Sequence, residues 1–138
     1  MRLTTIDTDA LTAARPWRHA RQVGWEWPAV VKRLKANRFD LAVWHGDVLC
    51  GLAYGPAEAD WVGIAFLQGN PDPDHPLKGR MAAIAVAVLE TQARAAGAAE
   101  TRLVRPLPEL ARRYARQGYL PVADRPDLDY LRKSGATG

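Results

Sequence analysis

The sequence has a single cysteine and no long uncharged apolar segment, and each absence excludes a class of protein. Cys50 cannot form a disulfide within the chain, and its apolar surroundings at 48–52 indicate a buried small side chain in a reducing compartment. No stretch approaches the ~20 uncharged apolar residues that span a bilayer. Residues 1–16 are interrupted by charged side chains and lack the apolar stretch of a secretory signal. We therefore expect a cytoplasmic protein with no membrane partner.

Metal-binding and nucleic-acid-binding patterns are also missing. The histidines at positions 19, 45 and 75 have no ligand spacing, so we predict no metal site. Residues 1–38 are strongly basic, whereas charges in the rest of the chain nearly balance. That charge would attract an anionic partner, but the basic residues alternate with apolar positions and accompany no recognised motif. A solvated helix face is the favoured interpretation, and no nucleic-acid partner is expected.

The chain has the length and composition of one globular domain. It contains 138 residues, of which 48% are hydrophobic and 25% charged. A chain of this size buries about 70% of its unfolded surface, so it needs neither a disulfide nor a metal to fold. We expect one domain over residues 1–133. The tail 134–138 has almost nothing to bury, and we expect it to fray.

Hydrophobic patterning predicts seven strands, in which β-branched and aromatic residues alternate or run together between turn residues. They are expected at 2–6, 39–45, 48–55, 60–67, 101–104, 119–122 and 129–131. Gly46 and Asp47 separate the second strand from the third. Glycine at the first central position supplies the positive φ that a type II′ turn requires, so these strands should form an antiparallel hairpin. The strand 60–67 is almost wholly apolar, which favours a central strand covered on both faces.

Helices are expected in four places: 9–14, from Pro28 to about Asn37, 78–96 and 109–117. Asp7 or Thr8 would cap the first of them. The third is rich in alanine, carries larger apolar residues three or four positions apart, and is followed by Gly97 as a stop signal. Together the elements predict an α/β (α+β) fold. Its mixed, mostly antiparallel sheet would have six to seven strands with helices on both faces.

This order of elements and three local motifs resemble the Gcn5-related N-acetyltransferase family. The first motif is the turn 75–83, at the start of the alanine-rich helix. The second is the segment 114–119, in which Tyr114 precedes a glycine by four residues and an aromatic residue follows. The third is the hairpin 39–55, with a polar turn before an apolar strand. The resemblance covers roughly residues 39–122 and implies the acyl-CoA N-acyltransferase fold.

The resemblance also implies a site for acetyl-CoA as co-substrate. A helix N-terminus has unpaired N–H groups and a partial positive charge, which suit a pyrophosphate. The groups implied to bind it belong to Lys78, Gly79, Arg80, Met81, Ala82 and Ala83. Met81 and Ala83 replace glycines that the family usually has, and the preceding loop is longer and carries two aspartates. These departures leave open a second interpretation, a catalytically inactive binding or regulatory module.

The implied reaction is direct transfer of the acetyl group to an amine. A backbone N–H near Phe66, Leu67 and Gln68 would polarise the carbonyl oxygen. Tyr114 stands at the position of the family's general acid, and its ordinary pKa of ~10 keeps it protonated at neutral pH. Packing under the sheet, with its hydroxyl hydrogen-bonded, is the alternative role. Glu58 is a candidate base, although an exposed turn residue would explain it equally well.

The acceptor is a small-molecule or peptide amine that the sequence does not identify. Trp25 and Trp27 lie where the family builds part of its acceptor pocket, and aromatic walls there would bind an apolar or cationic group. Core packing or a dimer contact would also account for both tryptophans. The sequence therefore leaves open whether the chain forms a homodimer.

Overall fold

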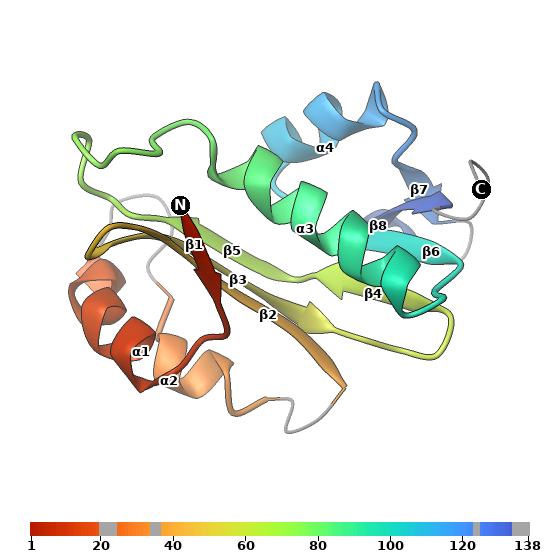
Figure 1. Cartoon of the computed structure of the whole chain (residues 1–138). Coiled ribbons are helices and arrows are strands. Elements are labelled where there is room, and N and C mark those ends of the chain that lie inside the picture. Colours follow the sequence, from red (N-terminus) through yellow and green to blue (C-terminus); the bar gives the residue numbers. More distant parts are fainter. Residues whose placement is uncertain (20–24, 34–36, 123–124, 134–138) are drawn as a thin grey trace.

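The computed structural model describes residues 1–19, 25–33, 37–122 and 125–133. The tail 134–138 and positions 34–36 of one predicted helix lie outside the described residues. Figure 1 shows the elements in chain order. They are β1 Arg2–Thr4, α1 Thr8–Ala14, a 3₁₀ turn Arg15–His19, α2 Trp27–Val30, β2 Arg38–His45, β3 Val48–Pro56, β4 Trp61–Ile64, β5 Phe66–Gly69, α3 Met81–Ala95, β6 Glu100–Val104, α4 Pro108–Ala115, β7 Leu120–Val122 and β8 Arg125–Lys133.

The strands form two sheets of four strands each. The first has the order β1-β2-β3-β5 and is antiparallel throughout. The second has the order β4-β6-β8-β7, in which only the β4–β6 pair is parallel. The sheets meet where β3 leads into β4, through the bridge between Ala57 and Val62 and a 2.7 Å bond from the Glu58 N–H to the Trp61 carbonyl. The predicted mixed sheet is therefore present in two halves.

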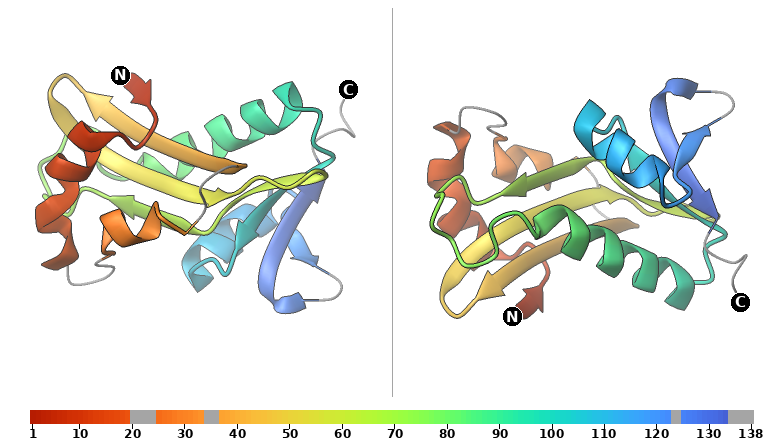
Figure 2. Two further views of the ribbon diagram at one scale, coloured as in Figure 1. Left: turned by 90° about the horizontal axis from the view of Figure 1, so that it is seen from below. Right: turned by 90° about the horizontal axis from the view of Figure 1, so that it is seen from above.

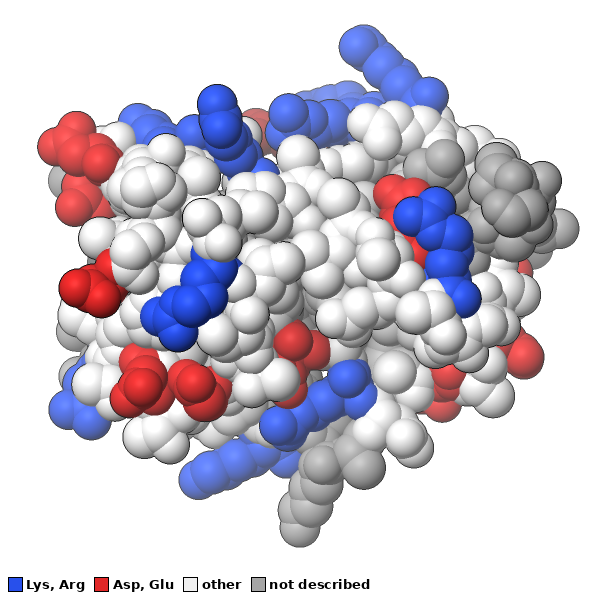
Figure 3. Space-filling model, viewed as in Figure 1, with Lys and Arg blue, Asp and Glu red and all other residues white. Residues whose placement is uncertain are grey.

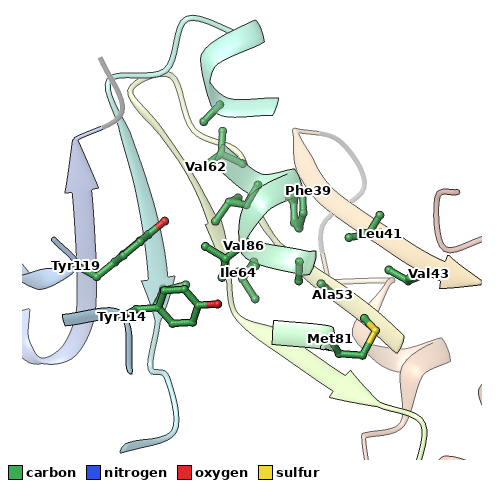
Figure 4. Close-up of a cluster of buried hydrophobic side chains, with 14 of the residues drawn as sticks. Phe39, Leu41, Val43, Ala53, Val62, Ile64, Met81, Val86, Tyr114 and Tyr119 are labelled. Atoms are coloured by element: carbon green, nitrogen blue, oxygen red, sulfur yellow. The ribbon is translucent and has the colours of Figure 1, made fainter. Parts of the chain in front are cut away.

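Helices cover the first sheet on both faces, as predicted. Figure 2 shows α1 and α2 on one side of it and α3 on the other. Apolar side chains along β2 alternate between the two layers: Phe39, Leu41 and Val43 pack toward α3, and Ala42 and Trp44 toward α1 and α2. Figure 4 shows the α3 layer, which also receives side chains from α4 and from the second sheet. No helix in the described part of the chain is long and apolar enough to cross a bilayer.

Several local signals act as the sequence predicts. Asp7 caps α1, because its Oδ1 accepts the Ala10 N–H at 2.9 Å. Gly46 has φ +59°, Asp47 keeps a negative φ, and His45 pairs with Val48, which is the expected type II′ hairpin. Gly97, with φ +73°, follows the end of α3.

Several predicted boundaries are wrong, among them those of the last strand, which runs from Arg125 to Lys133 rather than over 129–131. The helix from Pro28 ends at Val30 rather than near Asn37. The long helix begins at Met81 rather than Lys78, because the preceding residues form turns: the Lys78 N–H bonds to the His75 carbonyl at 3.2 Å. The strand predicted at 60–67 is two strands, β4 and β5, which lie on either side of Ala65.

Candidate functional site

A cleft opens where the two sheets separate. β4 and β6 pair in parallel from Trp61 opposite Glu100 to Ile64 opposite Leu103. After Ala65 the chain continues as β5, which pairs with β3, while β6 stays with β8. The gap between β5 and the end of β6 is a cleft of about 1400 Å³. The loop before α3, the first residues of α3 and the start of α4 complete its walls.

The backbone of β5 presents hydrogen-bonding groups to this cleft, because β5 is the edge strand of its sheet. In an antiparallel ladder, alternate residues direct both backbone groups toward the partner strand. The Asn70 N–H bonds to a β3 carbonyl at 2.8 Å, so Gln68 and Phe66, two and four residues earlier, also face β3. Leu67 and Gly69 must then face the cleft. Of the three amides predicted for this strand, only that of Leu67 is directed outward.

The side chains of β5 also have defined places. Phe66, Leu67 and Gln68 all line the cleft. The Gln68 side-chain oxygen accepts the Trp27 indole N–H at 2.7 Å, and its Nε2 donates to the Trp17 carbonyl at 3.3 Å. Gln68 is therefore held by the layer beneath α1 and α2.

The two predicted acceptor-pocket tryptophans have different environments. Trp25 lines the cleft, and its ring meets Phe66 edge-on with 4.7 Å between centroids. Trp27 is 1% exposed, bonds to Gln68 and lies outside the cleft lining. Core packing, one of the roles considered for these residues, describes Trp27. A buried hydrogen bond ties Trp27 to β5, and Trp27 lies with Trp25 at a smaller pocket beside α1, so its acceptor-pocket role stays a prediction.

The first turn of α3 faces the cleft. The Ile84 N–H bonds to the Arg80 carbonyl at 3.0 Å and starts the helical ladder. The N–H groups of Met81, Ala82 and Ala83 precede that ladder and have no helical acceptor. Lys78, Gly79, Met81 and Ala82 line the cleft, whereas Arg80 and Ala83 are exposed outside its lining.

Met81 does not close this approach, although the resemblance in sequence implied a glycine at this position. Its side chain turns down onto the sheet and is 7% exposed. Gly51 makes the room, since a Cβ there would lie 2.1 Å from the Met81 Cε. Gly79 has φ +82° and open space within 4 Å of the position a Cβ would take. Small residues therefore leave the helix start accessible from the cleft.

The charged residues of the lining are mainly basic. Four of them, Arg33, Lys78, Arg105 and Arg113, face two acidic ones, Asp72 and Glu109. Figure 3 shows basic side chains gathered along the edge that carries α4 and the start of α3. In the long loop, the Asp72 carboxylate accepts the Asp74 N–H at 2.9 Å and so holds the loop in its turn. Asp74 itself lies outside the cleft lining.

His75 is a buried residue of the cleft lining. It is 8% exposed, and its buried Nδ1 has no hydrogen-bond partner in the described part of the chain. Burial lowers its pKa, with nearby Asp72 acting to raise it and Lys78 to lower it further. No sequence pattern separates this histidine from an exposed loop residue. The same holds for Arg33, Arg105 and Arg113, which come together only because the chain folds around the cleft.

Tyr114 lies under the point where the strands separate. It is 3% exposed, and its hydroxyl has no hydrogen-bond partner among the described residues. Figure 4 shows this hydroxyl turned toward Ile64, the last residue of β4. Burial raises its pKa, so the hydroxyl holds its proton more firmly than an exposed tyrosine. Tyr114 is not itself in the lining, although Leu110 and Arg113 on the same helix are.

The predicted base does not lie with these residues. Glu58 is exposed in the connection between β3 and β4, outside the cleft lining. It precedes the paired end of β4, whereas the cleft opens at the other end of that strand. The structure therefore does not bring Glu58 and Tyr114 together. No group of three or more histidine, cysteine or acidic residues among the described positions is arranged to hold a metal ion.

Solved structures share this fold over nearly the whole chain. The ribosomal-protein alanine N-acetyltransferase from Escherichia coli has a TM-score of 0.66 at 16% identity, covering 99% of this chain and 96% of that one. An aminoglycoside 6′-N-acetyltransferase from Enterococcus faecium has a TM-score of 0.67 at 14% identity, with 97% of each chain covered. This chain has the fold of the Gcn5-related N-acetyltransferases.

Other structures with the acetyltransferase fold include the PaiA N-acetyltransferase from Thermoplasma acidophilum in complex with coenzyme A. Its TM-score is 0.59 at 14% identity, and the similarity covers 96% of this chain and 98% of that one. No family model matches the sequence, and no curated protein matches it either. The similarity is therefore one of three-dimensional structure, at a level of identity where only the fold is shared.

Proposed function

We propose that this protein transfers an acetyl group from acetyl-CoA to an amine in the cleft between β5 and β6. The observation that carries the proposal is the separation of β4 and β6 after Ile64, which leaves a free strand edge beside an accessible helix N-terminus. Acetyl-CoA would supply an activated thioester. The chain's own residues would bind its phosphates, orient the carbonyl group and provide a proton.

The residues around the start of α3 fit a pyrophosphate. The first-turn amides of Met81 and Ala82 face the cleft, and Gly79 leaves the approach open. Lys78 adds a full positive charge beside them. The unpaired Nδ1 of buried His75 is a further polar atom without a partner in this wall. The predicted contribution of Arg80 is limited to long-range charge, because its side chain lies outside the lining.

The edge of β5 fits the carbonyl end of the thioester. The Leu67 N–H is directed into the cleft and would stabilise the oxygen as negative charge develops on it. The amine nitrogen forms a bond to the carbonyl carbon, and the carbon–sulfur bond breaks with its electron pair going to sulfur. Tyr114 donates its hydroxyl proton to that sulfur and regains one from solvent. Overall the amine loses one proton, and the thiol gains one.

An inactive binding module is the alternative, and the position of Glu58 favours it. Glu58 lies outside the cleft, so no predicted base accompanies Tyr114. An amine that is already neutral can attack without such a base, whereas a protonated amine cannot. A thiol-release assay over a panel of amines at increasing pH separates the two functions. Release that rises with the neutral fraction of the amine supports transfer, and no release at any pH supports the module.

Calorimetric titration with acetyl-CoA tests the cofactor site directly. We expect saturable binding that Lys78→Gln weakens about two- to fivefold, as for one exposed charge contact. Arg94→Gln is the matched control, because Arg94 is exposed in the last turn of the same helix. Absence of binding at millimolar acetyl-CoA would remove the proposal. Equal losses in the two variants would remove the assigned role of Lys78.

A further inference from the structure

One wall of the cleft carries side chains that have no part in the acetyl-CoA site proposed above. Trp25 meets the Phe66 ring edge-on, with an interplanar angle of 85°. The Arg33 guanidinium lies over the same Phe66 ring, 5.1 Å from its centre. All three residues line the cleft. They form an apolar surface with a cation beside it, on the side of β5 that faces the layer of α1 and α2.

This wall also contains a hydrogen-bond donor without an acceptor. The Trp25 Nε1 is buried and has no hydrogen-bond partner among the described residues. A buried donor left unpaired is destabilising, so such donors are rare. The other tryptophans with described indole bonds differ: Trp27 donates to Gln68 at 2.7 Å and Trp44 to Thr4 at 3.1 Å. A ligand oxygen would satisfy the Trp25 donor.

The charges of the cleft select against a cationic ligand. Its two acidic lining residues belong to other walls, Asp72 to the loop before α3 and Glu109 to α4. The Asp72 carboxylate is in addition bonded to the Asp74 N–H. Arg33 is the charged residue of the aromatic wall. A polyamine such as an aminoglycoside, whose acetyltransferases share this fold, would meet excess positive charge here.

We propose that the acetyl acceptor is an amine that carries a carboxylate next to an apolar group. Arg33 would pair with the carboxylate, and the Trp25 N–H would donate to one of its oxygens. The rings of Trp25 and Phe66 would contact the apolar group. This proposal rests on the acetyl-transfer function, because it assigns the substrate class of the same cleft.

Two amines that differ only in the carboxylate test the proposal. Thiol release from acetyl-CoA is measured with phenylalanine, with phenylalaninamide and with spermidine as a polycation. We expect kcat/KM for phenylalanine to exceed that for either other amine by about tenfold. For each amine, KM is expressed as the concentration of its neutral form. Arg33→Gln should abolish this preference by raising KM for phenylalanine with little change in kcat. Arg2→Gln is the matched control, because Arg2 also lies over a ring, that of Trp44 at 4.9 Å, away from the cleft.

Binding gives a second measurement that needs no turnover. N-acetylphenylalanine and its amide are titrated into the protein saturated with CoA, and tighter binding of the carboxylate form supports the proposal. Phenylalaninamide or spermidine acting as well as phenylalanine would overturn it and leave acetyl transfer intact. An unchanged preference in Arg33→Gln, or no binding of either acetylated probe, would also overturn it. Failure to bind acetyl-CoA at all would instead remove the underlying function.

Discussion

Two buried tyrosines in the same apolar layer have hydroxyl groups in different environments. Tyr114 and Tyr119 meet edge-on, with 5.7 Å between ring centres. The Tyr119 hydroxyl shares a 2.9 Å hydrogen bond with Thr101, whereas no described residue pairs with that of Tyr114. Figure 4 shows the two hydroxyls pointing in different directions. Tyr119 is therefore tied into the core, and Tyr114 retains a proton that it can donate.

We expect Tyr114→Phe to lower kcat about a hundredfold, in the range of general acid catalysis, with little change in the affinity for acetyl-CoA. Burial raises the pKa of Tyr114 above the ordinary tyrosine value of about 10. Ionisation of this hydroxyl should therefore not reduce the wild-type rate at any pH below that value. Steady-state kinetics across pH, together with calorimetry, measure both effects. Tyr119→Phe is the control, since it removes a structural hydrogen bond and should preserve turnover. Equal turnover in Tyr114→Phe and wild type would contradict the role.

His75 should report phosphate binding through its titration. Its pKa is lowered chiefly by burial, so the imidazole is neutral near pH 7. A phosphate group beside it would favour the protonated form and raise that pKa. Nuclear magnetic resonance of the imidazole protons should therefore show a pKa below 6.5 that increases on addition of CoA.

His75→Asn assigns that signal, because the variant lacks this titration. The same shift affects stability. A folded pKa below the ordinary value means that the stability contributed by neutral His75 is fully present above the ordinary value of about 6.5. It is lost as the pH falls from there through the folded pKa. His75→Asn should weaken this loss. A His75 pKa that CoA leaves unchanged would place the phosphates elsewhere.

At the scale of elements, the separation of β4 from β5 at Ala65 creates the site. The Ala65 N–H bonds to the Tyr54 carbonyl at 2.9 Å, and Ala65 lies between the two strands without belonging to either ladder. One continuous apolar segment of sequence thereby joins both sheets. Its first half has a parallel partner, and its second half presents a free edge to the cleft.

Hydrogen exchange along β5 tests that geometry. The Gln68 amide faces β3 and should exchange slowly, whereas the Leu67 amide faces the cleft and should exchange much faster. Saturation with acetyl-CoA should slow exchange at Leu67 and leave Gln68 unchanged, because only the first amide would gain an acceptor. Measurement by nuclear magnetic resonance resolves the two neighbours. Equal protection of both amides without ligand would show that the edge of β5 is already paired.

Close packing of β3 against its neighbours predicts unequal effects of alanine at its glycines. A Cβ at Gly55 would lie 2.0 Å from the Gly63 carbonyl oxygen, which is backbone and cannot turn aside. A Cβ at Gly51 would meet the Met81 side chain, which can change rotamer. We expect Gly55→Ala to destabilise the fold by about 3 kcal/mol or more and Gly51→Ala by about 1–3 kcal/mol.

Urea unfolding of both variants measures these differences. Gly46→Ala serves as a reference for backbone conformation alone, since a Cβ there meets nothing within 4 Å but φ is +59°. Its loss should be about 1 kcal/mol. A shorter residue at Met81 should restore part of the Gly51→Ala stability and none of the Gly55→Ala stability. Equal losses at Gly55 and Gly51 would mean that the strands separate easily.

At the scale of the whole molecule, the cleft lies where the two sheets part, and a ligand in it contacts both halves. Its walls come from β5 of the first sheet, β6 of the second, and the starts of α3 and α4. The buried layer beneath α3 receives side chains from all of these elements. Binding across the cleft should therefore stabilise the folded chain as one unit.

Acetyl-CoA at a hundred times its dissociation constant should raise the free energy of unfolding by about 2.7 kcal/mol. For a chain of this length, that increase corresponds to a melting temperature higher by roughly 5–15 °C. Thermal unfolding followed by circular dichroism measures the shift, and Lys78→Gln should reduce it at a fixed ligand concentration. A melting temperature that does not respond to acetyl-CoA would contradict binding within the cleft.

Local patterns in the sequence predicted much of this fold. The hairpin turn at Gly46, the cap at Asp7 and the end of α3 before Gly97 depend on residues close together in the chain, and all three are confirmed. The predicted first-turn position of Pro28 is confirmed, but the helix that contains it is shorter than predicted. Its length depends on packing that no local signal describes.

The candidate site was predicted less completely, because its parts are far apart in sequence. The turn before α3 and Tyr114 were predicted from local motifs. Residues of that turn line the cleft, and so do Leu110 and Arg113 on the helix that carries Tyr114. Tryptophan is a residue type that suits a pocket wall, and glutamate one that suits a base. In the structure, however, Trp27 is buried against Gln68 and Glu58 lies outside the cleft. Arg33 and His75 gave no local signal.

By itself the sequence determined which segments form strands and helices, where most of them turn, and that both faces of the central strands are covered, because these features follow from residue spacing and backbone preference. Only the tertiary structure decided that the segment after Trp61 divides at Ala65, that the first turn of α3 faces an open cleft, and which charged side chains surround it. The reason is physical: burial, pairing and electric charge at a site depend on neighbours that the fold brings together from distant parts of the chain.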